Sequence, residues 1–456
     1  MNSFDVFDTL IARRFYDSKS IWFQIGKEYG IDNFENFRPI PDDGSRTFEE
    51  IYNELVDKGY ISENIKTKIM QREIELEISN SYGIKENIDK VADGDLLITD
   101  MYLPGYVIMQ IVRSAGMKKQ VSIYQSNRDK GSGKIWNILH KNPPYIHIGD
   151  NEHSDYNKAK EYGIKSQLYT GSSYNGNEKL LIQNKLNGIA NLVREIRLSN
   201  NILLHNDYFT LSCQYNLPLI FIILEQLHRK ISNPITFLGR DCQSLFKICN
   251  SYYTTGYYLP FSRKVAYTNP KLASLYLSSN TTPNHMLVDI SSTGETWKLL
   301  SQYGSHPLTT VIYSDSENRP YLPKTFDYIT KNSECGSTNL MLEVMNCADH
   351  GMLKNITLLE DRLFFTEYAD HELPSDIIDI IHKPIHDAVK LKSFYHKFIR
   401  AELSNKTDDF LKDIFKYLVQ NICSNFTLAS SIPHFLEREN EYHQEIINQR
   451  ENKWKS

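Results

Sequence analysis

Short apolar segments alternate with stretches of helical periodicity in the first part of the chain. The apolar segments lie at residues 95–104, 121–127 and 145–155, and each is followed by a polar loop and a helix-like stretch. Residues 11–94 instead show apolar positions at three- and four-residue spacing, which is typical of amphipathic helices. Strands that alternate with helices form mostly parallel sheets. The pattern predicts an α/β domain at residues 1–170 with an inserted helical cap at about 11–94.

The same alternation begins again after a Gly/Ser/Asn-rich stretch at 171–179, which has the composition of a linker. Residues 180–230 have a helical pattern. Strand-to-loop junctions then follow at 235–246, 285–297 and 308–317. From about residue 375 onward, the spacing predicts amphipathic helices. We therefore expect an α/β fold with two Rossmann-like parallel-sheet domains, 1–170 and 171–375, and a helical C-terminal region at 376–456.

Composition narrows the class of protein. The chain has 456 residues, 41% of them hydrophobic, which is enough for ordinary cores. The 51 Lys and Arg against 56 Asp and Glu give a net charge of −5, which argues against a general nucleic-acid binder. The six cysteines lack the spacing of a zinc site and favour a reduced, cytosolic setting. No segment resembles a signal peptide, and the longest apolar run, 217–224, is too short to cross a bilayer, so we expect peripheral membrane contact at most.

Acidic residues follow the apolar segments where parallel strands would end. Asp5 and Asp8 lie in SFDVFDTL, Thr99 lies in LLITDMY, and Asp150 and Asp155 lie in HIGDNEHSD. The carboxyl ends of parallel strands form the ligand-binding edge of such a sheet, so we expect these residues at one site. A carboxylate is ionised at neutral pH and can attack phosphorus without a base, provided that cations neutralise it and the phosphoryl oxygens. Each segment alone also fits an ordinary turn or helix cap.

These segments, together with a lysine ahead of a helix in DKGSGKIWNIL, occur in the order of the four motifs of the haloacid dehalogenase-like superfamily. Residues 3–168 resemble that family. The resemblance implies a phosphatase in which Asp5 is the nucleophile and Thr99 holds a phosphoryl oxygen. It also implies a bound Mg²⁺, which prefers oxygen ligands. The ligands implied are Asp5, Asp150, Asp155 and a backbone carbonyl near Phe7.

Two roles in this motif set have competing candidates. The family pattern of K-x-x-G/P-x-I/L-aromatic fits Lys130 in KGSGKIW, whereas Lys134 would lie inside the following helix, so we assign the charge-balancing role to Lys130. The usual general acid, two residues after the nucleophile, is replaced here by Phe7, and the next acid is Asp8. If the chain turns helically after Asp5, residues three apart share a face and Asp8 can take that role. Otherwise this half is a non-catalytic relative of the family.

A second group of polar residues lies in VDISSTGET at 288–296. The segment resembles the ribose-phosphate loop of type I phosphoribosyltransferases, with Val288 in place of the first of two adjacent acids. The resemblance implies that Asp289 holds ribose hydroxyls. The residues that would cradle a 5-phosphate with backbone N–H groups and hydroxyls are Ser291, Ser292, Thr293, Gly294 and Thr296.

Other segments of the same half extend this resemblance. Arg240 and Asp241 in FLGRDCQSLF occupy the position where such enzymes bind pyrophosphate and its metal, although the two also fit a structural ion pair. Arg263 and Lys264 in FSRK correspond to a basic segment that closes over the diphosphate. Candidates for the acceptor side, which also fit ordinary structural roles, are Glu343 and His350.

The two resemblances together imply one sequence of reactions. Transfer of 5-phosphoribosyl from phosphoribosyl diphosphate leaves a phosphate on C5, and a phosphatase on the same chain removes it. Tandem proteins of this kind are similar to bifunctional enzymes that install ribofuranose in bacterial surface polysaccharides such as O antigen or capsule. The partner would then be a lipid-linked or nascent glycan at the inner face of the membrane. A cap that limits substrate size favours small phosphosugars over phosphoproteins.

Three other hypotheses remain open at this point. In the first, only the phosphatase acts and the second domain binds substrate without transfer chemistry. In the second, both halves are sensors of phosphosugars or nucleotides and have no turnover. In the third, the acceptor is a nucleobase and the protein is a salvage enzyme. The sequence leaves the acceptor, its linkage, the oligomeric state and the role of the C-terminal helices undetermined.

Overall fold

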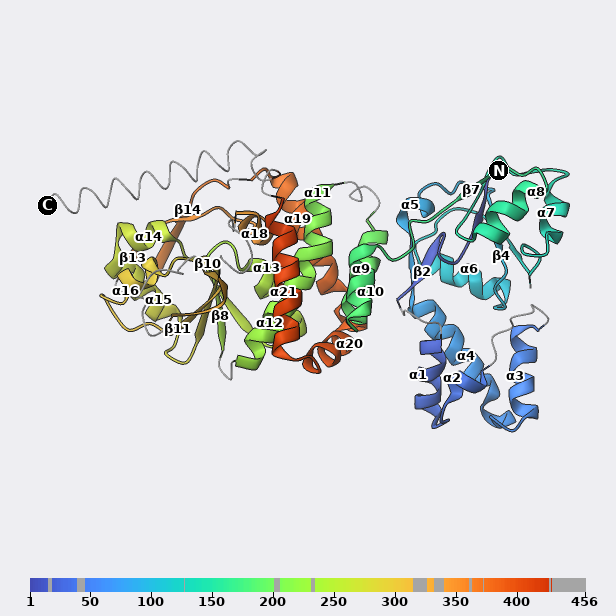
Figure 1. The fold of residues 1–456 in the computed structure, drawn as a ribbon, viewed down its shortest axis with the longest axis horizontal. Coiled ribbons are helices and arrows are strands. Elements are labelled where there is room, and N and C mark those ends of the chain that lie inside the picture. Colours follow the sequence, from blue (N-terminus) through green and yellow to red (C-terminus); the bar gives the residue numbers. More distant parts are fainter. Residues whose placement is uncertain are drawn as a thin grey trace. The chain divides into compact units, whose positions relative to one another are not determined.

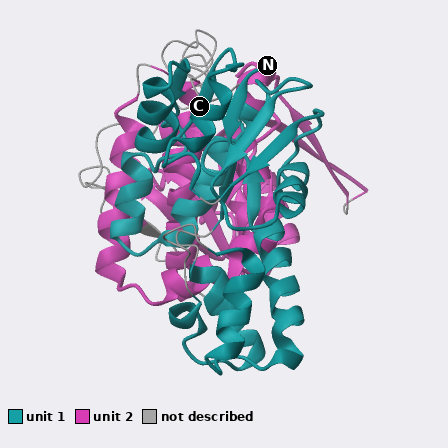
Figure 2. Ribbon diagram, turned by 90° about the vertical axis from the view of Figure 1, so that its right-hand side faces the viewer, with its two compact units in different colours: residues 1–204 teal, residues 205–456 magenta. Residues whose placement is uncertain are grey.

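The chain folds into two compact units, residues 1–204 and 205–456, drawn in teal and magenta in Figure 2. The computed structural model describes residues 1–14, 19–38, 46–126, 128–200, 206–230, 234–314, 326–331, 340–360, 363–371, 373–425 and 428. Both units are built on a five-stranded parallel sheet, as the alternating pattern predicts (Figure 1).

Unit 1 has its sheet in the order β5-β4-β1-β6-β7. The strands are β1 (Ser3–Asp5), β4 (Leu96–Thr99), β5 (Ser122–Gln125), β6 (His147–Gly149) and β7 (Ser166–Leu168). The first strand is central, and Phe4 is paired with Leu97 on one side and Ile148 on the other. All three side chains are buried, which explains why these short strands are apolar. The helices that accompany the sheet are α5 (Lys85–Ile88), α6 (Gly105–Ser114), α7 (Lys134–Leu139), the π-helical turn η1 (Glu152–Asn157) and α8 (Lys158–Glu161).

The inserted helices leave the sheet through a hairpin of β2 (Ile11–Arg13) and β3 (Ser81–Gly83), which pair antiparallel. Between them lie α1 (Lys19–Tyr29), α2 (Phe34–Phe37), α3 (Phe48–Asp57) and α4 (Glu63–Ser79). A capping box starts α3, since Thr47 Oγ1 accepts from Glu50 N and Glu50 Oε2 accepts from Thr47 N. The cap is therefore shorter than the predicted 11–94, because both ends of that range form the hairpin and α5.

A buried ion pair holds the inserted helices together. Arg38 Nη2 donates to Glu73 Oε1 at 2.9 Å, and neither side chain is exposed. The same carboxylate accepts from Tyr52 Oη at 2.5 Å and from Tyr102 Oη at 3.0 Å. The hydrogen bonds compensate the desolvation of the buried charge. Because Tyr102 follows β4, this contact also joins the cap to the sheet domain.

Unit 1 extends beyond the predicted boundary at residue 170. The stretch expected to be a linker leads into α9 (Gly176–Gln183), which begins with a capping box between Asn175 and Glu178, and α10 (Asn187–Leu198) follows. Arg197 binds Glu178 at 2.7 Å and the carbonyl of Gly171 at 2.8 Å. The boundary moves to 204 because these contacts fix residues 171–200 to the first unit.

Unit 2 has its sheet in the order β12-β11-β10-β8-β9. The strands are β8 (Ile235–Leu238), β9 (Gly256–Leu259), β10 (Met286–Ser292), β11 (Leu308–Ser314) and β12 (Phe326–Lys331). A separate antiparallel hairpin consists of β13 (Leu353–Leu359) and β14 (Leu363–Tyr368). The helices that precede or connect the strands are α11 (Asp207–Leu211), the π-helical turn η3 (Ser212–Asn216), α12 (Leu217–Lys230), α13 (Gln243–Tyr252), α14 (Arg263–Thr268), α15 (Pro270–Asn280), α16 (Glu295–Leu300) and α18 (Leu340–Asn346).

The predicted C-terminal helices belong to unit 2. They are α19 (Ser375–Lys390), α20 (Lys392–Ser404) and α21 (Asp408–Cys423). Arg400 on α20 binds Glu225 on α12 at 2.6 Å, and Tyr252 on α13 donates to the carbonyl of Ala388 on α19 at 2.7 Å. Of the predicted region 376–456, the part beyond residue 425 lies outside the described residues, except residue 428. In the part of the chain that the structure describes, no helix combines the length and apolarity that a bilayer crossing requires.

Candidate active site

Three aspartates meet at the carboxyl edge of the sheet in unit 1. Asp5 ends the central strand β1, Asp150 follows the neighbouring strand β6, and Asp155 lies in the next turn, η1. One carboxylate oxygen from each lies within 4.8 Å of the others. Gly149 makes this approach possible, since a Cβ at that residue would lie 2.4 Å from Asp155 Cγ. The three oxygens form a donor set that fits a hard divalent cation and does not by itself select Mg²⁺.

Lys130 supplies the positive charge within this cluster. Its side chain is 5% exposed, and its ammonium group binds Asp5 and lies 2.8 Å from Asp155 Oδ1. The competing Lys134 is 68% exposed and is 3.4 Å from Asp129. The structure therefore brings Lys130, and not Lys134, to the aspartates.

Burial and the charge of Lys130 have opposite effects on the pKa values of the three aspartates. Burial raises the pKa of Asp5 well above its usual range, although Lys130 opposes the rise. Burial also raises the pKa of Asp150. Burial would raise the pKa of Asp155 as well, but Lys130 and His147 outweigh it and lower that pKa to about 2. A group of acids with only one lysine favours a further cation, which would stabilise the ionised form of Asp5.

The chain turns immediately after Asp5. Leu10 N and Ile11 N both donate to the carbonyl of Val6, at 2.9 and 3.0 Å. Within this turn Asp8 has a φ of 56°, in the left-handed region that a non-glycine residue rarely adopts. Asp8 Oδ1 accepts from Arg194 Nη2 at 2.9 Å. Because Asp8 has a left-handed φ, this segment is a turn rather than the right-handed helical turn considered from the sequence.

Thr99 and the following residue complete the edge of the sheet. Thr99 ends β4, beside β1, and its buried hydroxyl accepts from Met101 N at 3.3 Å. Asp100 Oδ1 accepts from Ser126 Oγ at 2.5 Å and from Lys130 N at 3.3 Å. Asp100 thus fixes the loop that carries the lysine.

The sequence interpretation missed Asp100 and His147. His147 Nε2 lies 3.2 Å from Asp155 Oδ1, and its Nδ1 lies 2.9 Å from Ser3 Oγ. Burial lowers the pKa of His147, although Asp155 opposes the change, so the ring orients the carboxyl group chiefly by hydrogen bonding. The only signal in the sequence is position, since Asp100 directly follows the motif residue Thr99 and His147 precedes the motif acid Asp150 by three residues.

The point where strand order reverses in unit 2 carries three of the predicted residues, Arg240, Asp241 and Asp289. In the order β9-β8-β10-β11, the loops after β8 and β10 lie on either side of this point, where open α/β sheets bind ligands. Arg240 and Asp241 follow β8, and their side chains lie 3.3 Å apart. Gly239, with a φ of 66°, makes the turn that places them. Asp289 lies in β10, directly beside β8.

Charge links the two loops of unit 2. Burial and the neighbouring Asp241 raise the pKa of Asp289 to about 7, while Arg263 opposes the rise. Arg263 and Lys264 begin α14, which Ser262 caps through its hydroxyl. The basic segment thus lies within electrostatic reach of Asp289. Two neighbouring carboxyl groups can bind a cation or hydroxyl groups, and the nearby arginine can bind an anionic group of the same ligand.

The loop after β10 has the local conformation of a helix start. Ser292 Oγ accepts from Gly294 N at 3.1 Å, and Gly294 precedes α16 with a φ of 79°. The other hydroxyl residues predicted for the phosphate cradle, each of them half-buried, are Ser291, Thr293 and Thr296.

The two acceptor candidates have different surroundings. His350 Nε2 lies 2.9 Å from Tyr258 Oη, and the same hydroxyl donates to the carbonyl of Gly239. His350 is therefore connected to the loop that carries Arg240. Glu343 is half-buried within α18.

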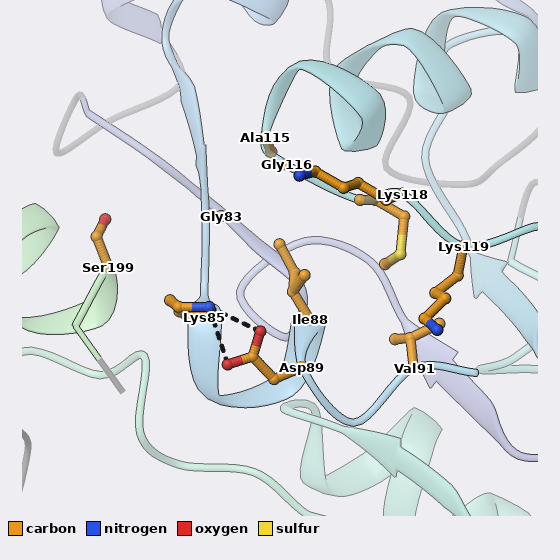
Figure 3. Close-up of a pocket in the computed structure, with 11 residues that line it drawn as sticks. Gly83, Lys85, Ile88, Asp89, Val91, Ala115, Gly116, Lys118, Lys119 and Ser199 are labelled. Carbon is orange, nitrogen blue, oxygen red and sulfur yellow. Dashed lines mark hydrogen bonds and ion pairs between the residues drawn. The ribbon is translucent and has the colours of Figure 1, made fainter. Parts of the chain in front are cut away.

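A different part of unit 1 contains a cavity of about 450 Å³ (Figure 3). It is lined by residues between 83 and 91, by residues 115–119 and by Ser199. The lysines around it are exposed, and Lys85 is already bound to Asp89 at 2.8 Å. None of the three aspartates lines this cavity, so it is separate from the candidate active site.

Comparison of the chain with models of known protein families and with curated protein sequences finds no match.

Proposed function

We propose that unit 1 is a Mg²⁺-dependent phosphatase with Asp5 as its nucleophile. The observation that carries the proposal is the convergence of Asp5, Asp150 and Asp155 on one point, with Lys130 bound to two of them. In a cluster with a purely structural role, the positive charge would only have to balance the negative charge of the acids. Two buried acids and the half-buried Asp150, with Lys130 as the one lysine bound to them among the described residues, retain an excess of negative charge that a bound divalent cation would balance.

The residues of this site divide the chemistry between them. Asp5 attacks phosphorus, and the bond from phosphorus to the leaving oxygen breaks with its electron pair on that oxygen. Thr99 and Lys130 hold the phosphoryl oxygens and balance their charge. The divalent cation, when bound by the three aspartates, would position and neutralise the phosphoryl group. Water then hydrolyses the phosphoaspartate, which returns Asp5 as a carboxylate and releases phosphate.

The inserted helices favour a small substrate. They enter and leave through the β2–β3 hairpin, close to the turn after Asp5, and Tyr102 joins them to the loop that follows Thr99. A cap fixed on both sides of the site excludes water and bulky substrates. We therefore propose a phosphosugar, such as a 5-phosphorylated ribofuranose, as the substrate.

Removal of the divalent cation should abolish phosphate release from ribose 5-phosphate. We expect EDTA to lower the rate about 10³-fold, because the cation contributes several kcal/mol of charge stabilisation. Added Mg²⁺ in excess of the chelator should restore it, which a colorimetric phosphate assay measures. Phosphate release that continues unchanged in EDTA would contradict the proposal, and a heat-treated sample controls for phosphate from other sources.

For unit 2, we infer binding of 5-phosphoribosyl diphosphate and transfer of its phosphoribosyl group to a glycan. The position of Arg240, Asp241, Arg263 and Asp289 around the reversal of strand order supports this inference. Unit 1 would then remove the 5-phosphate and leave ribofuranose. The glycan, lipid-linked or nascent, implies action in the cytoplasm at the inner face of the membrane.

Replacement of Asp289 should separate this function from that of unit 1. In Asp289→Ala, we expect pyrophosphate release from phosphoribosyl diphosphate and a glycan acceptor to fall about 10²-fold, since a charged group that contacts the sugar is lost. Phosphate release from ribose 5-phosphate should be unchanged. Asp408→Asn, which changes a 73% exposed acid of the same unit, is the matched control for both assays.

A second candidate function rests on Val288. This residue is fully buried in β10, where the resembled family has the first of its two acids. Unit 2 would then bind phosphosugars without transfer. No pyrophosphate release from wild-type protein with any glycan or nucleobase acceptor, together with active phosphate release, would favour this version.

A further inference from the structure

Tyr258 fixes the start of the loop that follows β8 in unit 2. The loop begins at Gly239, whose φ of 66° allows a sharp turn, and it carries Arg240 and Asp241. Gly239 N donates to the carbonyl of Leu259 at 3.0 Å, and the carbonyl of Gly239 accepts from Tyr258 Oη. Both backbone groups of Gly239 are therefore bound by residues at the end of the neighbouring strand β9.

His350 holds the hydroxyl group of Tyr258 in the orientation that this bond needs. Burial raises the pKa of Tyr258, so the hydroxyl keeps its single proton. A carbonyl oxygen can only accept, so this proton points to Gly239, and His350 Nε2 donates to Tyr258 Oη at 2.9 Å. The ring of His350 also packs against Tyr368 of β14, with 4.9 Å between the ring centroids. The hydrogen bonds from His350 through Tyr258 to Gly239 thus run in one direction.

The residue before His350 holds the other end of the same loop. Gln243, which begins α13, donates from Nε2 to Asp349 Oδ1 at 2.6 Å. Asp349 N donates in return to Gln243 Oε1 at 3.3 Å. Two adjacent residues, Asp349 and His350, therefore bind both ends of the loop at 239–243, one of them directly and the other through Tyr258.

The segment that carries these two residues, 347–351, is itself anchored within unit 2. His382 Nε2 on α19 donates to the carbonyl of Cys347 at 2.6 Å. A Cβ at Gly351 would lie 2.0 Å from the carbonyl oxygen of Ala369, so the backbone approaches the end of β14 more closely than any other residue type allows. Residues 347–351 therefore form a fixed support for the loop after β8.

We propose that Tyr258 and His350 are positioning residues that hold the loop after β8 in the conformation that binds the diphosphate of phosphoribosyl diphosphate. The proposal rests on the function proposed for unit 2. Arg240 and Asp241 contact the ligand from this loop. Tyr258 and His350 act through Gly239 and do not touch it. If only the held conformation binds, the apparent Kd is inversely proportional to the fraction of molecules in which the loop is held.

The test measures binding by calorimetric titration of the full chain with Asp5→Asn, which should leave unit 1 unable to hydrolyse the ligand. Phosphoribosyl diphosphate titrated in the presence of Mg²⁺ gives both the Kd and the number of binding sites, and the binding that Asp289→Ala removes belongs to unit 2. For Tyr258→Phe, we expect this Kd to rise about tenfold, as for a loop held in about one molecule in ten, with the number of sites unchanged. A merely structural role would lower the number of folded sites and leave their Kd unchanged.

Matched variants make the result specific. Tyr257→Phe removes the hydroxyl of the preceding residue, which is 51% exposed and stacks on His285, and it should leave the Kd unchanged. His350→Ala should raise the Kd as Tyr258→Phe does, and the double variant should raise it no further, because the two residues act as one unit. His350→Gln keeps a donor toward Tyr258 and should restore most of the affinity. The His350 variants also cover the case that Tyr258→Phe does not fold.

Two results would overturn different statements. An unchanged Kd in folded Tyr258→Phe or His350→Ala, with or without fewer sites, overturns the positioning role and leaves the binding proposed for unit 2 standing. An equal rise of the Kd in Tyr257→Phe does the same. Asp5→Asn protein whose titration with phosphoribosyl diphosphate does not differ from that of Asp5→Asn/Asp289→Ala overturns the function proposed for unit 2, and the positioning role with it.

Discussion

Asp5→Asn should lower phosphate release from ribose 5-phosphate by about 10⁴-fold or more, the scale of a lost nucleophile. Asparagine has nearly the same shape, but its amide cannot form the phosphoaspartate. The fold should tolerate the change. Asp5 is a buried acid whose pKa is raised, and Lys130 retains Asp155 as its partner. We therefore expect a folded protein that has lost the chemistry alone.

A direct observation of the intermediate strengthens this test. Wild-type protein that is mixed with substrate and quenched in acid should carry one phosphoryl group by mass spectrometry, and Asp5→Asn should carry none. Asp89→Asn, which changes an exposed acid of the same unit, should behave as wild type in both assays. Phosphate release by Asp5→Asn at the wild-type rate would exclude Asp5 as the nucleophile.

The same variant tests the order of the two proposed reactions. With phosphoribosyl diphosphate and an acceptor, Asp5→Asn should accumulate a product that retains its 5-phosphate, while Asp289→Ala should form none. Because the two residues lie in different units, each variant is the other's control. A dephosphorylated product from Asp5→Asn would show that the phosphate is removed elsewhere.

The sequence was sufficient to predict the convergence of the acids, because it depends on a general property of parallel sheets. Asp5, Thr99 and Asp150 each follow a recognisable apolar strand, and adjacent parallel strands end at the same edge. The convergence in unit 1 required only the strand pattern and no knowledge of side-chain geometry. In unit 2, the roles of the residues after β8 and β10 were taken instead from the resemblance of their loops to those of phosphoribosyltransferases.

The extent of unit 1 could not be predicted in this way. The capping box at Asn175 is visible in the sequence, but it shows only that a helix begins there. Which unit the helix joins depends on long-range contacts, such as the bond from Arg194 to Asp8 across the first unit. The residues at which the cap begins and ends likewise depend on the pairing of Ala12 with Tyr82, which are far apart in the sequence. Tertiary contacts of this kind leave no local pattern.

Lys130→Met should destabilise unit 1 more than any surface change. In wild-type protein Lys130, Asp5 and Asp155 are all nearly inaccessible to solvent, and the ammonium group is shared between the two acids. Its removal leaves two buried carboxyl groups without their cationic partner, which typically costs about 3–5 kcal/mol. We expect that loss in the free energy of unfolding measured by urea in EDTA. Lys134→Met removes an exposed lysine and should cost less than about 1 kcal/mol.

The recovery of Lys130→Met in Mg²⁺ distinguishes a metal site from a purely structural cluster. A cation that binds only the folded protein at 100 times its Kd stabilises it by about 2.7 kcal/mol. We expect Mg²⁺ to raise the free energy of unfolding of Lys130→Met more than that of wild type, because the acids of the variant have no competing lysine. The variant should nevertheless remain a poor phosphatase.

In EDTA, lowering the pH should also narrow the difference in unfolding free energy between Lys130→Met and wild type. Asp5 already has a raised pKa in the folded protein, Lys130 opposes that rise, and its loss raises the pKa further. An acid with a raised folded pKa loses stability as pH rises above its unfolded value, about 4, and regains it as the pH falls. If the loss in unfolding free energy of Lys130→Met depends on neither Mg²⁺ nor pH, Lys130 stabilises unit 1 by packing rather than by charge.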